Sequence, residues 1–378
     1  MFKKIISNFF ILLLPLLLAA NSFAKGKTEN VILISLDGMR WQEVFKGVDK
    51  RFFDQDKYIK YGYTHENFKN IYWDNDEDER RKKLFPFIWN VIGKNGQLYG
   101  NRDLGSYADL TNKFYFSYPG YNEMLTGFAD PRISSNGKIL NPNKTFLEWL
   151  DEKAPYKGKT AAFASWDVFP YIINQERSDV FLNSDFDDME ELNSRIKDLN
   201  QIQRDTPSPW DTVRLDVFTH EFAVEYMKEK KPRALYISYG ETDDFAHDGH
   251  YDLYIHAAKR TDDFIRRVWE YVESDPHYAG KTTLLITTDH GRGYDSLENW
   301  RHHGEGISPI NGSGDRDDKH IWMAVIGPDT PANGEMKNTQ AIFQNQIAAT
   351  LMKFLGLEYQ GSHPEIISGK PINSMFKK

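Results

Sequence analysis

The sequence predicts an α/β fold in three layers, with a central, mainly parallel β-sheet flanked by helices. Short apolar runs rich in β-branched residues recur along the chain, and none of them alternates cleanly between apolar and polar residues. Such runs are typical of strands that are covered on both faces. Helical patterns lie between the runs, and an alternation of strands and helices favours a parallel sheet.

Helices are expected at residues 145–150, at 220–232 and at about 253–273. The second of these segments ends in basic residues and a proline, as helix C-termini do, and the third places its apolar residues on one face. Five apolar runs between such segments are expected to form strands of the sheet. These runs are residues 30–38, 160–166, 234–240, 282–291 and 321–328.

Residues 41–110 fit the alternation less well, and we interpret them as an elaboration on the core fold. Within them, the charge block at 74–83 has its acidic half before its basic half. This order complements a helix dipole, so we expect a solvated helix there. No repeat or low-complexity linker is visible, so residues 25–378 are interpreted as one domain.

Residues 1–24 are predicted to be a signal peptide that is cleaved near Ala24. Two lysines precede an apolar run from Phe9 to Ala20, and small residues follow it. The run has 12 residues, whereas a helix that spans a membrane needs about 20, so we expect no membrane anchor. The predicted location of the mature protein is therefore periplasmic or secreted.

The net charge and the absence of cysteine limit the kinds of partner and metal site that the chain can have. The formal net charge is −8, which favours neither nucleic acid nor an anionic membrane as a partner. The chain has no cysteine, so it offers neither a disulfide framework nor a thiolate ligand for a metal.

Ligand-type side chains follow three of the predicted strands. Asp37 follows the first strand, Asp243 and His247 follow the third, and Asp289 and His290 follow the fourth. Loops at the carboxyl ends of strands in an α/β sheet meet at one edge, where ligands bind. We therefore expect these side chains to converge on a metal site.

The pair His302 and His303 follows shortly afterwards and adds further ligands. Three aspartates with three or four histidines exceed the four ligands that one tetrahedral zinc ion needs. Two divalent ions, with zinc as the expected identity, would use the whole set. Pairs of ions about 4 Å apart catalyse in-line displacement at phosphorus.

Ser117 is the candidate nucleophile. It follows an aromatic, strand-like run, and Pro119-Gly120 is expected to turn the chain into a helix. A hydroxyl near a helix N-terminus is stabilised as an alkoxide by the helix dipole and the free N–H groups. Thr111 and Ser106 are the neighbouring alternatives.

Taken in order, these motifs resemble the alkaline phosphatase superfamily, and most closely its nucleotide pyrophosphatase/phosphodiesterase branch. That branch carries a strand that ends in Asp-Gly, a Ser or Thr followed by x-Pro-Asn and LxTG, a Glu-x-Asp-x-x-x-His segment, Asp-His-Gly, and a late His-Gly. The match spans residues 30 to 304. The corresponding residues are Asp37-Gly38, "SYPG…MLTG" from Ser117, Glu241-Thr-Asp243 with His247, Asp289-His290-Gly291, and His303-Gly304.

This resemblance implies a phosphoric ester hydrolase of alkaline phosphatase-like fold that acts on a small-molecule phosphate ester, either a monoester or a diester. Ser117 would attack phosphorus to give a phosphoseryl intermediate, which water then hydrolyses. One zinc ion would be surrounded by Asp37, Ser117, Asp289 and His290, and the other would be held by Asp243, His247 and His303.

Several departures from the family pattern leave alternatives open. Gly120 replaces the usual Asn, and Tyr121 stands where the sulfatase motif has Arg. The competing hypotheses are a sulfatase-like or phosphotransfer enzyme of the same superfamily and a non-catalytic metal-dependent binding protein.

Three assignments at the site also stay open. His302 is the alternative to His303 as a ligand. Arg292 and Arg301 are close to the ligands in sequence and favour a doubly charged monoester. The candidates for a second donor to the phosphoryl group are Asn136, Asn141, Lys113 and Lys144.

Overall fold

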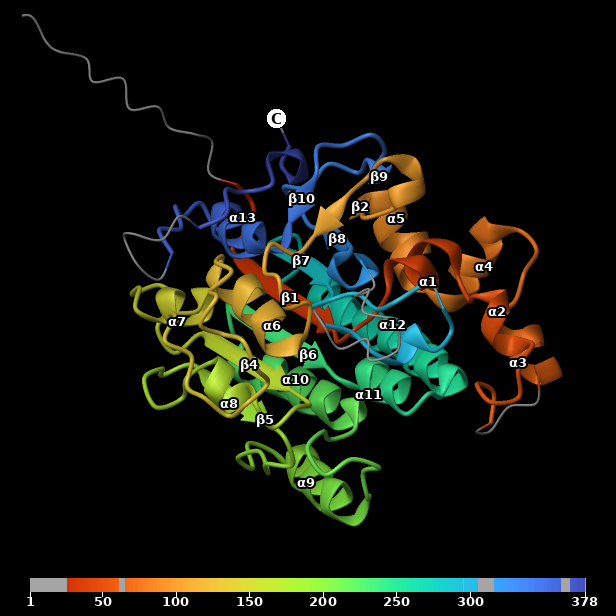
Figure 1. The fold of residues 1–378 in the computed structure, drawn as a ribbon. Helices are drawn as coiled ribbons and strands as arrows, with labels where there is room; N and C mark the ends of the chain where they lie inside the picture. The colour runs from red at the N-terminus through yellow and green to blue at the C-terminus, as the bar shows by residue number, and fades with distance from the viewer. Residues whose placement is uncertain (1–25, 61–64, 295, 305–315, 362–367, 378) are drawn as a thin grey trace, which may run out of the picture.

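The computed structural model describes residues 26–60, 65–294, 296–304, 316–361 and 368–377 (Figure 1). The predicted signal peptide lies outside the described residues. Among those residues, none of the helices is both long enough and apolar enough to cross a membrane.

The core is one eight-stranded sheet, which confirms the predicted fold class. Its order is β5-β4-β6-β1-β7-β8-β2-β9. The strands from β5 to β7 all run parallel, whereas β8 is antiparallel to both of its neighbours. In chain order the strands are β1 (Asn30–Leu36), β2 (Gln97–Tyr99), β4 (Thr160–Ala164), β5 (Phe181–Ser184), β6 (Ala234–Tyr239), β7 (Thr282–Thr287), β8 (Met323–Ile326) and β9 (Gly334–Glu335).

All five predicted strands are present, as β1, β4, β6, β7 and β8. Every residue of these strands is buried, as expected of runs without alternation. A separate small sheet pairs β3 (Ala108–Asp109) with β10 (Ile342–Phe343).

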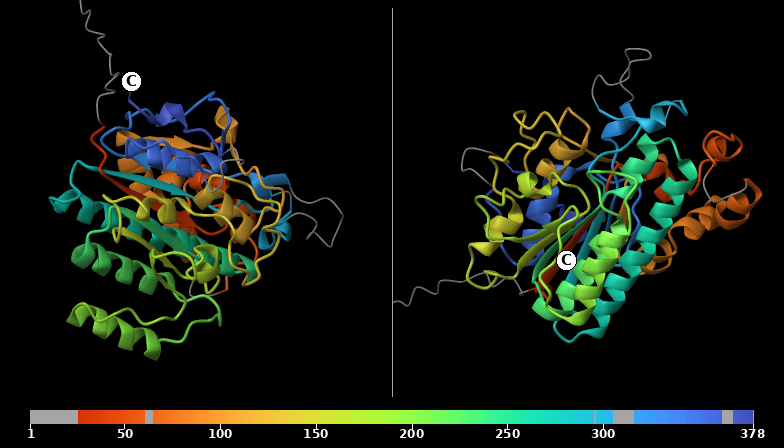
Figure 2. Two further views of the ribbon diagram at one scale, coloured as in Figure 1. Left: turned by 90° about the vertical axis from the view of Figure 1, so that its left-hand side faces the viewer. Right: turned by 90° about the horizontal axis from the view of Figure 1, so that it is seen from below.

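Helices cover both faces of the main sheet, as Figure 2 shows. Ile32 and Ile34 of β1 pack into a cluster with α10 (Asp216–Lys230) and α12 (Tyr251–Ser274). Val31 and Leu33 point to the opposite face, toward α6 (Ser117–Thr126). The same face also carries α7 (Phe146–Asp151), α8 (Phe169–Ile172) and α13 (Ile347–Phe354).

Residues 41–110 form a helical region that packs beside α12. The charge block forms α4 (Glu77–Leu84), a solvated helix with an acidic first turn and a basic last turn, as predicted. The region is more than an elaboration, because it also supplies β2 to the central sheet. Its helices besides α4 are α1 (Trp41–Lys46), α2 (Lys50–Phe53), α3 (His65–Tyr72), the π-helix η1 (Ile88–Ile92), α5 (Gly93–Asn95) and η2 (Arg102–Leu104).

Short helices make most of the remaining connections. α11 (Glu241–His247) follows β6 directly and carries two of the predicted ligands. The others are α9 (Ser194–Asp205), η3 (Asn299–Arg301), η4 (Arg316–Lys319), η5 (Gln344–Gln346) and η6 (Asn373–Met375).

Candidate metal centre

The three central strands place the predicted ligands side by side. β1 lies between β6 and β7, and the three strands are parallel, so their carboxyl ends lie at the same edge of the sheet. Asp37 follows β1, α11 follows β6, and Asp289 and His290 follow β7. Segments that are about 200 to 250 residues apart in the chain therefore meet at one place, as the sheet topology requires.

The first donor cluster forms around Nε2 of His290. This atom lies 3.2 Å from Oδ1 of Asp37, 3.4 Å from Oδ2 of Asp289 and 3.4 Å from Oγ of Ser117. All four side chains are buried. Four potential ligand atoms thus surround one point, in the grouping that the family resemblance implies.

The second donor cluster consists of Asp243, His247 and His303. Nε2 of His247 lies 3.0 Å from Oδ2 of Asp243 and 3.0 Å from Nε2 of His303. Nε2 of His303 is 3.5 Å from Oδ1 of Asp243. The two clusters adjoin, because the rings of His290 and His303 stack with centroids 3.8 Å apart.

His303 lies within the second donor cluster, and its neighbour His302 lies beside it. His303 is buried within the cluster, whereas His302 is exposed and lines the cavity beside it. Burial and the neighbouring His290 hold the pKa of His303 well below its usual range. Its imidazole is therefore neutral, which is the form that binds metal.

The carboxylate oxygens show that this site fits a cation. Oδ1 of Asp37 and Oδ2 of Asp289 are buried and have no hydrogen-bond partner among the described residues. The other oxygen of Asp37 accepts from the Tyr121 hydroxyl at 2.7 Å, and that of Asp289 accepts from the N–H of Gly38 at 3.0 Å. Oδ1 of Asp37 and Oδ2 of Asp289 each face the His290 imidazole, at 3.2 and 3.4 Å, without a hydrogen bond. A buried acceptor without a hydrogen bond is costly, and a divalent cation bound by both oxygens would satisfy them.

Without a cation, the pKa values of Asp289 and His290 are both raised. Burial and the adjacent Asp37 raise the pKa of Asp289 well above its usual range. Burial alone lowers the pKa of His290, but Asp289 and Asp37 outweigh it and raise this pKa to about 10. Because ligands must lose their protons to coordinate, we expect metal binding at this cluster to release protons.

Ser117 is the first residue of α6, and the backbone before it is strained. Tyr115 has φ 55°, in the left-handed region that is unfavourable for an aromatic residue. The predicted strand before Ser117 is wrong, because the structure shows no strand at residues 113–116. Pro119-Gly120 lies inside the first turn of α6 and not before it, which is allowed because the first N–H groups of a helix have no partner within the helix.

Gly120 allows the nucleophile helix to pack directly on a ligand segment. A Cβ atom at this position would lie 2.3 Å from the backbone oxygen of Asp289. The family's usual Asn therefore cannot fit here without a shift of the helix.

The alternative nucleophiles are engaged elsewhere. The Thr111 hydroxyl donates to buried Glu123 at 2.8 Å, and the Ser106 hydroxyl accepts from the N–H of Gly100 at 3.1 Å. Neither contacts the donor clusters in the described part of the chain.

Asn136 is the candidate second donor that the structure places at the site. It lines a cavity of about 320 Å³ at the clusters, and its Oδ1 accepts from the N–H of Tyr118 at 2.9 Å. Its amide nitrogen therefore remains as a donor. The other candidates lie away from this cavity: Asn141 bonds to Ile172, Lys144 pairs with Glu152, and Lys113 lies over the Phe114 ring. The cavity is lined by Phe116, Asn136, Asp243, His247, His302 and His303.

The two arginines hold ligand segments and do not line the cavity. The guanidinium of Arg292 is fully buried and contacts the Asp243 carboxylate. Arg301 donates to the backbone oxygen of His247 at 2.9 Å. The expectation that they face a doubly charged substrate is therefore unsupported, because their hydrogen bonds go to the protein. Sequence position alone could not show this.

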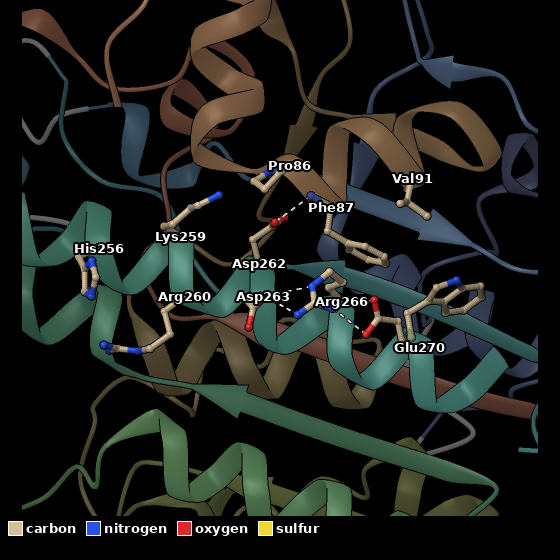
Figure 3. A pocket seen from close by; sticks show the side chains of 11 residues that line it. Pro86, Phe87, Val91, His256, Lys259, Arg260, Asp262, Asp263, Arg266 and Glu270 are labelled. Carbon is tan, nitrogen blue, oxygen red and sulfur yellow. Dashed lines mark hydrogen bonds and ion pairs between the residues drawn. The ribbon is translucent and has the colours of Figure 1, made fainter. Parts of the chain in front are cut away.

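A larger cavity of about 570 Å³ lies elsewhere, between α12 and the segment around η1 (Figure 3). Several of its charged groups are bonded to the protein: Arg266 pairs with Asp263 and Glu270, and Asp262 accepts from the N–H of Phe87 at 2.8 Å. None of the predicted ligands lines it. We therefore place the functional site at the smaller cavity, which Asp243, His247 and His303 of the second donor cluster line.

The sequence was compared with known proteins. Residues 200–359 match the model of the Metalloenzyme superfamily, and this segment holds five of the six Asp and His ligands. A search of curated proteins gives no match.

Solved structures of several enzymes share the fold at low identity. The alkaline phosphatase PafA is 11% identical with a TM-score of 0.57, over 94% of this chain and 100% of that one. The lipoteichoic acid synthase LtaP from Listeria monocytogenes is 12% identical with a TM-score of 0.55, over 92% and 76%. BT1596, a 2-O GAG sulfatase, is 12% identical with a TM-score of 0.54, over 92% and 74%.

These structures include a phosphatase, a synthase and a sulfatase, so the comparisons indicate the superfamily and not one branch of it. The family match covers the segment that carries most of the ligands, and the fold match covers nearly the whole chain. Residues 200–359 therefore resemble the Metalloenzyme superfamily, and the chain as a whole has the fold of these alkaline phosphatase-like enzymes.

Proposed function

We propose that this protein hydrolyses phosphate esters, with Ser117 as the nucleophile at a site for two divalent metal ions. One observation carries the proposal. The Ser117 hydroxyl, at the start of α6, lies within 3.4 Å of His290 in a cluster that contains two unpartnered carboxylate oxygens.

Zinc is the proposed metal. Asp37, Asp289, His290 and Ser117 would hold one ion, and Asp243, His247 and His303 the other. Carboxylates with one free oxygen, together with imidazoles, suit zinc better than calcium, which prefers six to eight oxygen ligands. Bound there, the ions would polarise the phosphoryl group and stabilise negative charge on the attacking and leaving oxygens.

The chain's own residues then perform the displacement. The Ser117 oxygen forms a bond to phosphorus as the bond to the ester oxygen breaks, and the Ser117 proton is released to solvent. The leaving alcohol gains a proton from solvent. Water then attacks the phosphoserine, which releases phosphate or a phosphate monoester and restores the hydroxyl.

Two residues that line the cavity would assist the attack of Ser117 on phosphorus. The amide nitrogen of Asn136 would donate to a phosphoryl oxygen, since its Oδ1 is already held by the N–H of Tyr118. The Phe116 ring forms an apolar wall of the cavity and reduces the access of water to the phosphoryl group.

The charges around the cavity favour a singly charged ester group. Among the described residues, no Lys or Arg lines it, and Arg292 and Arg301 are bonded to the protein. A monoester dianion would lack a cationic partner among these lining residues, so we propose a phosphodiester as the preferred substrate. A sulfate ester has the same single charge, which makes sulfate ester hydrolysis the second candidate.

We also propose that the protein acts outside the cytoplasm. The lysines and the apolar run at residues 1–24 support export with cleavage near Ala24. Cell fractionation followed by N-terminal sequencing of the mature protein tests this; an intact N-terminus in the cytoplasmic fraction would contradict it.

The activity is tested by initial rates on three substrates: an aryl phosphodiester, an aryl phosphate and an aryl sulfate. Each rate is measured with zinc-loaded protein and with protein treated with a chelator. We expect diester turnover that disappears with chelator and returns with zinc. Turnover of sulfate alone would select the sulfatase alternative. Ester cleavage only in the presence of an alcohol acceptor would indicate phosphotransfer. Bound zinc without any turnover would favour the binding-protein alternative.

A further inference from the structure

A chain of four buried hydroxyl groups ends on the metal ligand Asp37. The Tyr121 hydroxyl donates to Oδ2 of Asp37 at 2.7 Å and accepts from the Ser238 hydroxyl at 3.1 Å. Ser238 in turn accepts from Ser35 at 3.1 Å, and the Ser35 oxygen lies 2.7 Å from the Tyr236 hydroxyl. We call Tyr236, Ser35, Ser238 and Tyr121 the hydroxyl chain. All four residues are buried.

We propose that Tyr121, supported by the hydroxyl chain, is a positioning residue that makes Asp37 a ligand through one oxygen. The inference rests on the proposed metal binding at this site. In this proposal, the metal affinity of the first donor cluster depends on a neutral hydroxyl group that donates a hydrogen bond to Asp37.

The direction of the hydroxyl chain follows from the number of protons. An ionised carboxylate can only accept, so Tyr121 must donate its single proton to Asp37. The Tyr121 oxygen then accepts from Ser238, and Ser238 accepts from Ser35. Because Ser35 has given its proton to Ser238, Tyr236 must donate to Ser35. Four hydroxyls are thus oriented the same way, and each bond polarises the next one toward Asp37.

The hydroxyl chain also links the elements that carry the site. Ser35 on β1 pairs in register with Ser238 on β6, so the two hydroxyls are brought together by the sheet. Tyr121 lies four residues after Ser117 on α6, which places it on the same side of the helix as the nucleophile, one turn further on. The bond from Tyr121 to Asp37 therefore ties the nucleophile helix to the ligand at the end of β1.

Because Oδ2 of Asp37 accepts from Tyr121, only Oδ1 of this carboxylate is left without a hydrogen bond. This atom has no hydrogen-bond partner among the described residues and faces His290 at 3.2 Å. Asp289 is held in the same way by the N–H of Gly38, and Asp243 by Arg292. Of these three hydrogen-bond donors, Tyr121 can be removed with the least disturbance of the packing, because a Phe side chain keeps the aromatic ring.

The ring itself is fixed by packing that Tyr121→Phe retains. Tyr121 is fully buried, and its centroid lies 4.9 Å from that of Phe169 in an edge-to-face contact. The substitution therefore removes one hydroxyl and little else. Tyr254→Phe is the matched control, since Tyr254 is also fully buried and its hydroxyl accepts from the N–H of Arg40 at 3.1 Å, away from the ligands.

The test is titration of metal-free full-length protein with zinc and with cobalt(II). We expect two ions to bind to the wild type and to Tyr254→Phe. In Tyr121→Phe, one ion should bind about 10- to 100-fold more weakly, the usual effect of removing a group that orients a metal ligand, while the other ion binds within about twofold of wild type. The visible spectrum of the cobalt protein should change in Tyr121→Phe and not in the control.

A second variant protects the test against misfolding. Ser238→Ala leaves the bond between Tyr121 and Asp37 and removes only its support, so we expect a smaller loss of affinity at the same position. Equal affinities and cobalt spectra for wild type, Tyr121→Phe and Ser238→Ala would overturn the inference. Failure of the wild type itself to bind either metal would instead overturn the proposed function.

Discussion

Oγ of Ser117 lies 3.4 Å from Nε2 of His290, and these two residues are 173 positions apart in the chain. The contact joins the start of α6 to the carboxyl end of β7. It places the Ser117 hydroxyl, at the α6 N-terminus, among the potential ligand atoms of the first cluster.

Replacement of this hydroxyl should abolish turnover and spare the metals. For Ser117→Ala we expect kcat to fall by about 10³-fold or more, as for other removed nucleophiles, because the variant lacks the hydroxyl that forms the proposed covalent intermediate. Metal analysis should still find two ions, since six Asp and His ligands remain. Ser274→Ala is the control and should keep wild-type rates, because Ser274 is exposed and its hydroxyl donates to the backbone oxygen of Tyr271. Near-normal activity of Ser117→Ala would show that the nucleophile is misassigned.

Asn136 should act on the reacting phosphoryl group without binding metal. Asn136→Ala removes the amide donor, and kcat/KM should fall by about 10²-fold, the typical cost of one such donor. Steady-state kinetics with metal analysis measures both effects. Asn141→Ala is not a suitable control, because Asn141 is a buried structural residue. Lys113→Ala is a suitable control, because Lys113 is exposed. Unchanged kinetics of Asn136→Ala would remove Asn136 from the mechanism.

Arg292 should be required for the second metal position. Its guanidinium holds Asp243 through both the carboxylate and the backbone oxygen. We expect Arg292→Met to bind one zinc ion instead of two and to lose stability by about 3–5 kcal/mol, because a buried pair loses one partner. Arg301→Met, at a more exposed site, should keep both ions. Two tightly bound ions in Arg292→Met would contradict this role.

The packing of α6 against Asp289 predicts intolerance of any side chain at position 120. Gly120→Ala should displace either the helix or the ligand and reduce kcat by about 10²-fold, the scale expected for a 1 Å misplacement. Gly93→Ala is the matched control, since the nearest atom to its new Cβ lies 3.5 Å away. Equal activity of the two variants would show that the site adapts to the added methyl group.

Stability away from the site should depend on the ionisation of Asp262. Burial raises the pKa of this carboxyl to about 7, above its unfolded value of about 3.9. The folded state therefore binds the proton more tightly, so the contribution of Asp262 to stability is greatest at low pH and declines as pH rises toward 7. Asp262→Asn cannot ionise and should lack this decline.

Urea unfolding of wild type and Asp262→Asn at pH 5 and pH 8 measures the effect. The free energy of unfolding of wild type relative to the variant should be lower at pH 8 by on the order of 2 kcal/mol. Other groups that titrate cancel in the difference. A difference that is independent of pH would show that Asp262 is not protonated in the folded state.

The elements and the convergence of the candidate ligands were predictable because they depend on local pattern and on one topological rule. Apolar runs such as 234–240 became fully buried strands, and ligand types placed at strand ends converge whenever those strands are parallel neighbours. The seven proposed ligand and nucleophile residues therefore meet in the structure. The aromatic run before Ser117 misled the local interpretation, since its composition resembles a strand but Tyr115 adopts a left-handed conformation there.

Only the tertiary structure could decide which polar groups support the ligands. Sequence position placed Arg292 and Arg301 near the substrate, yet their hydrogen bonds go to Asp243 and His247. It also could not choose Asn136 among the four candidate donors or connect Tyr121 with Asp37. These relationships depend on distances between side chains that come from different strands and helices, and such distances exist only after the chain has packed. Secondary structure and strand-end chemistry are encoded locally, whereas hydrogen bonding around a buried site is a property of the whole fold.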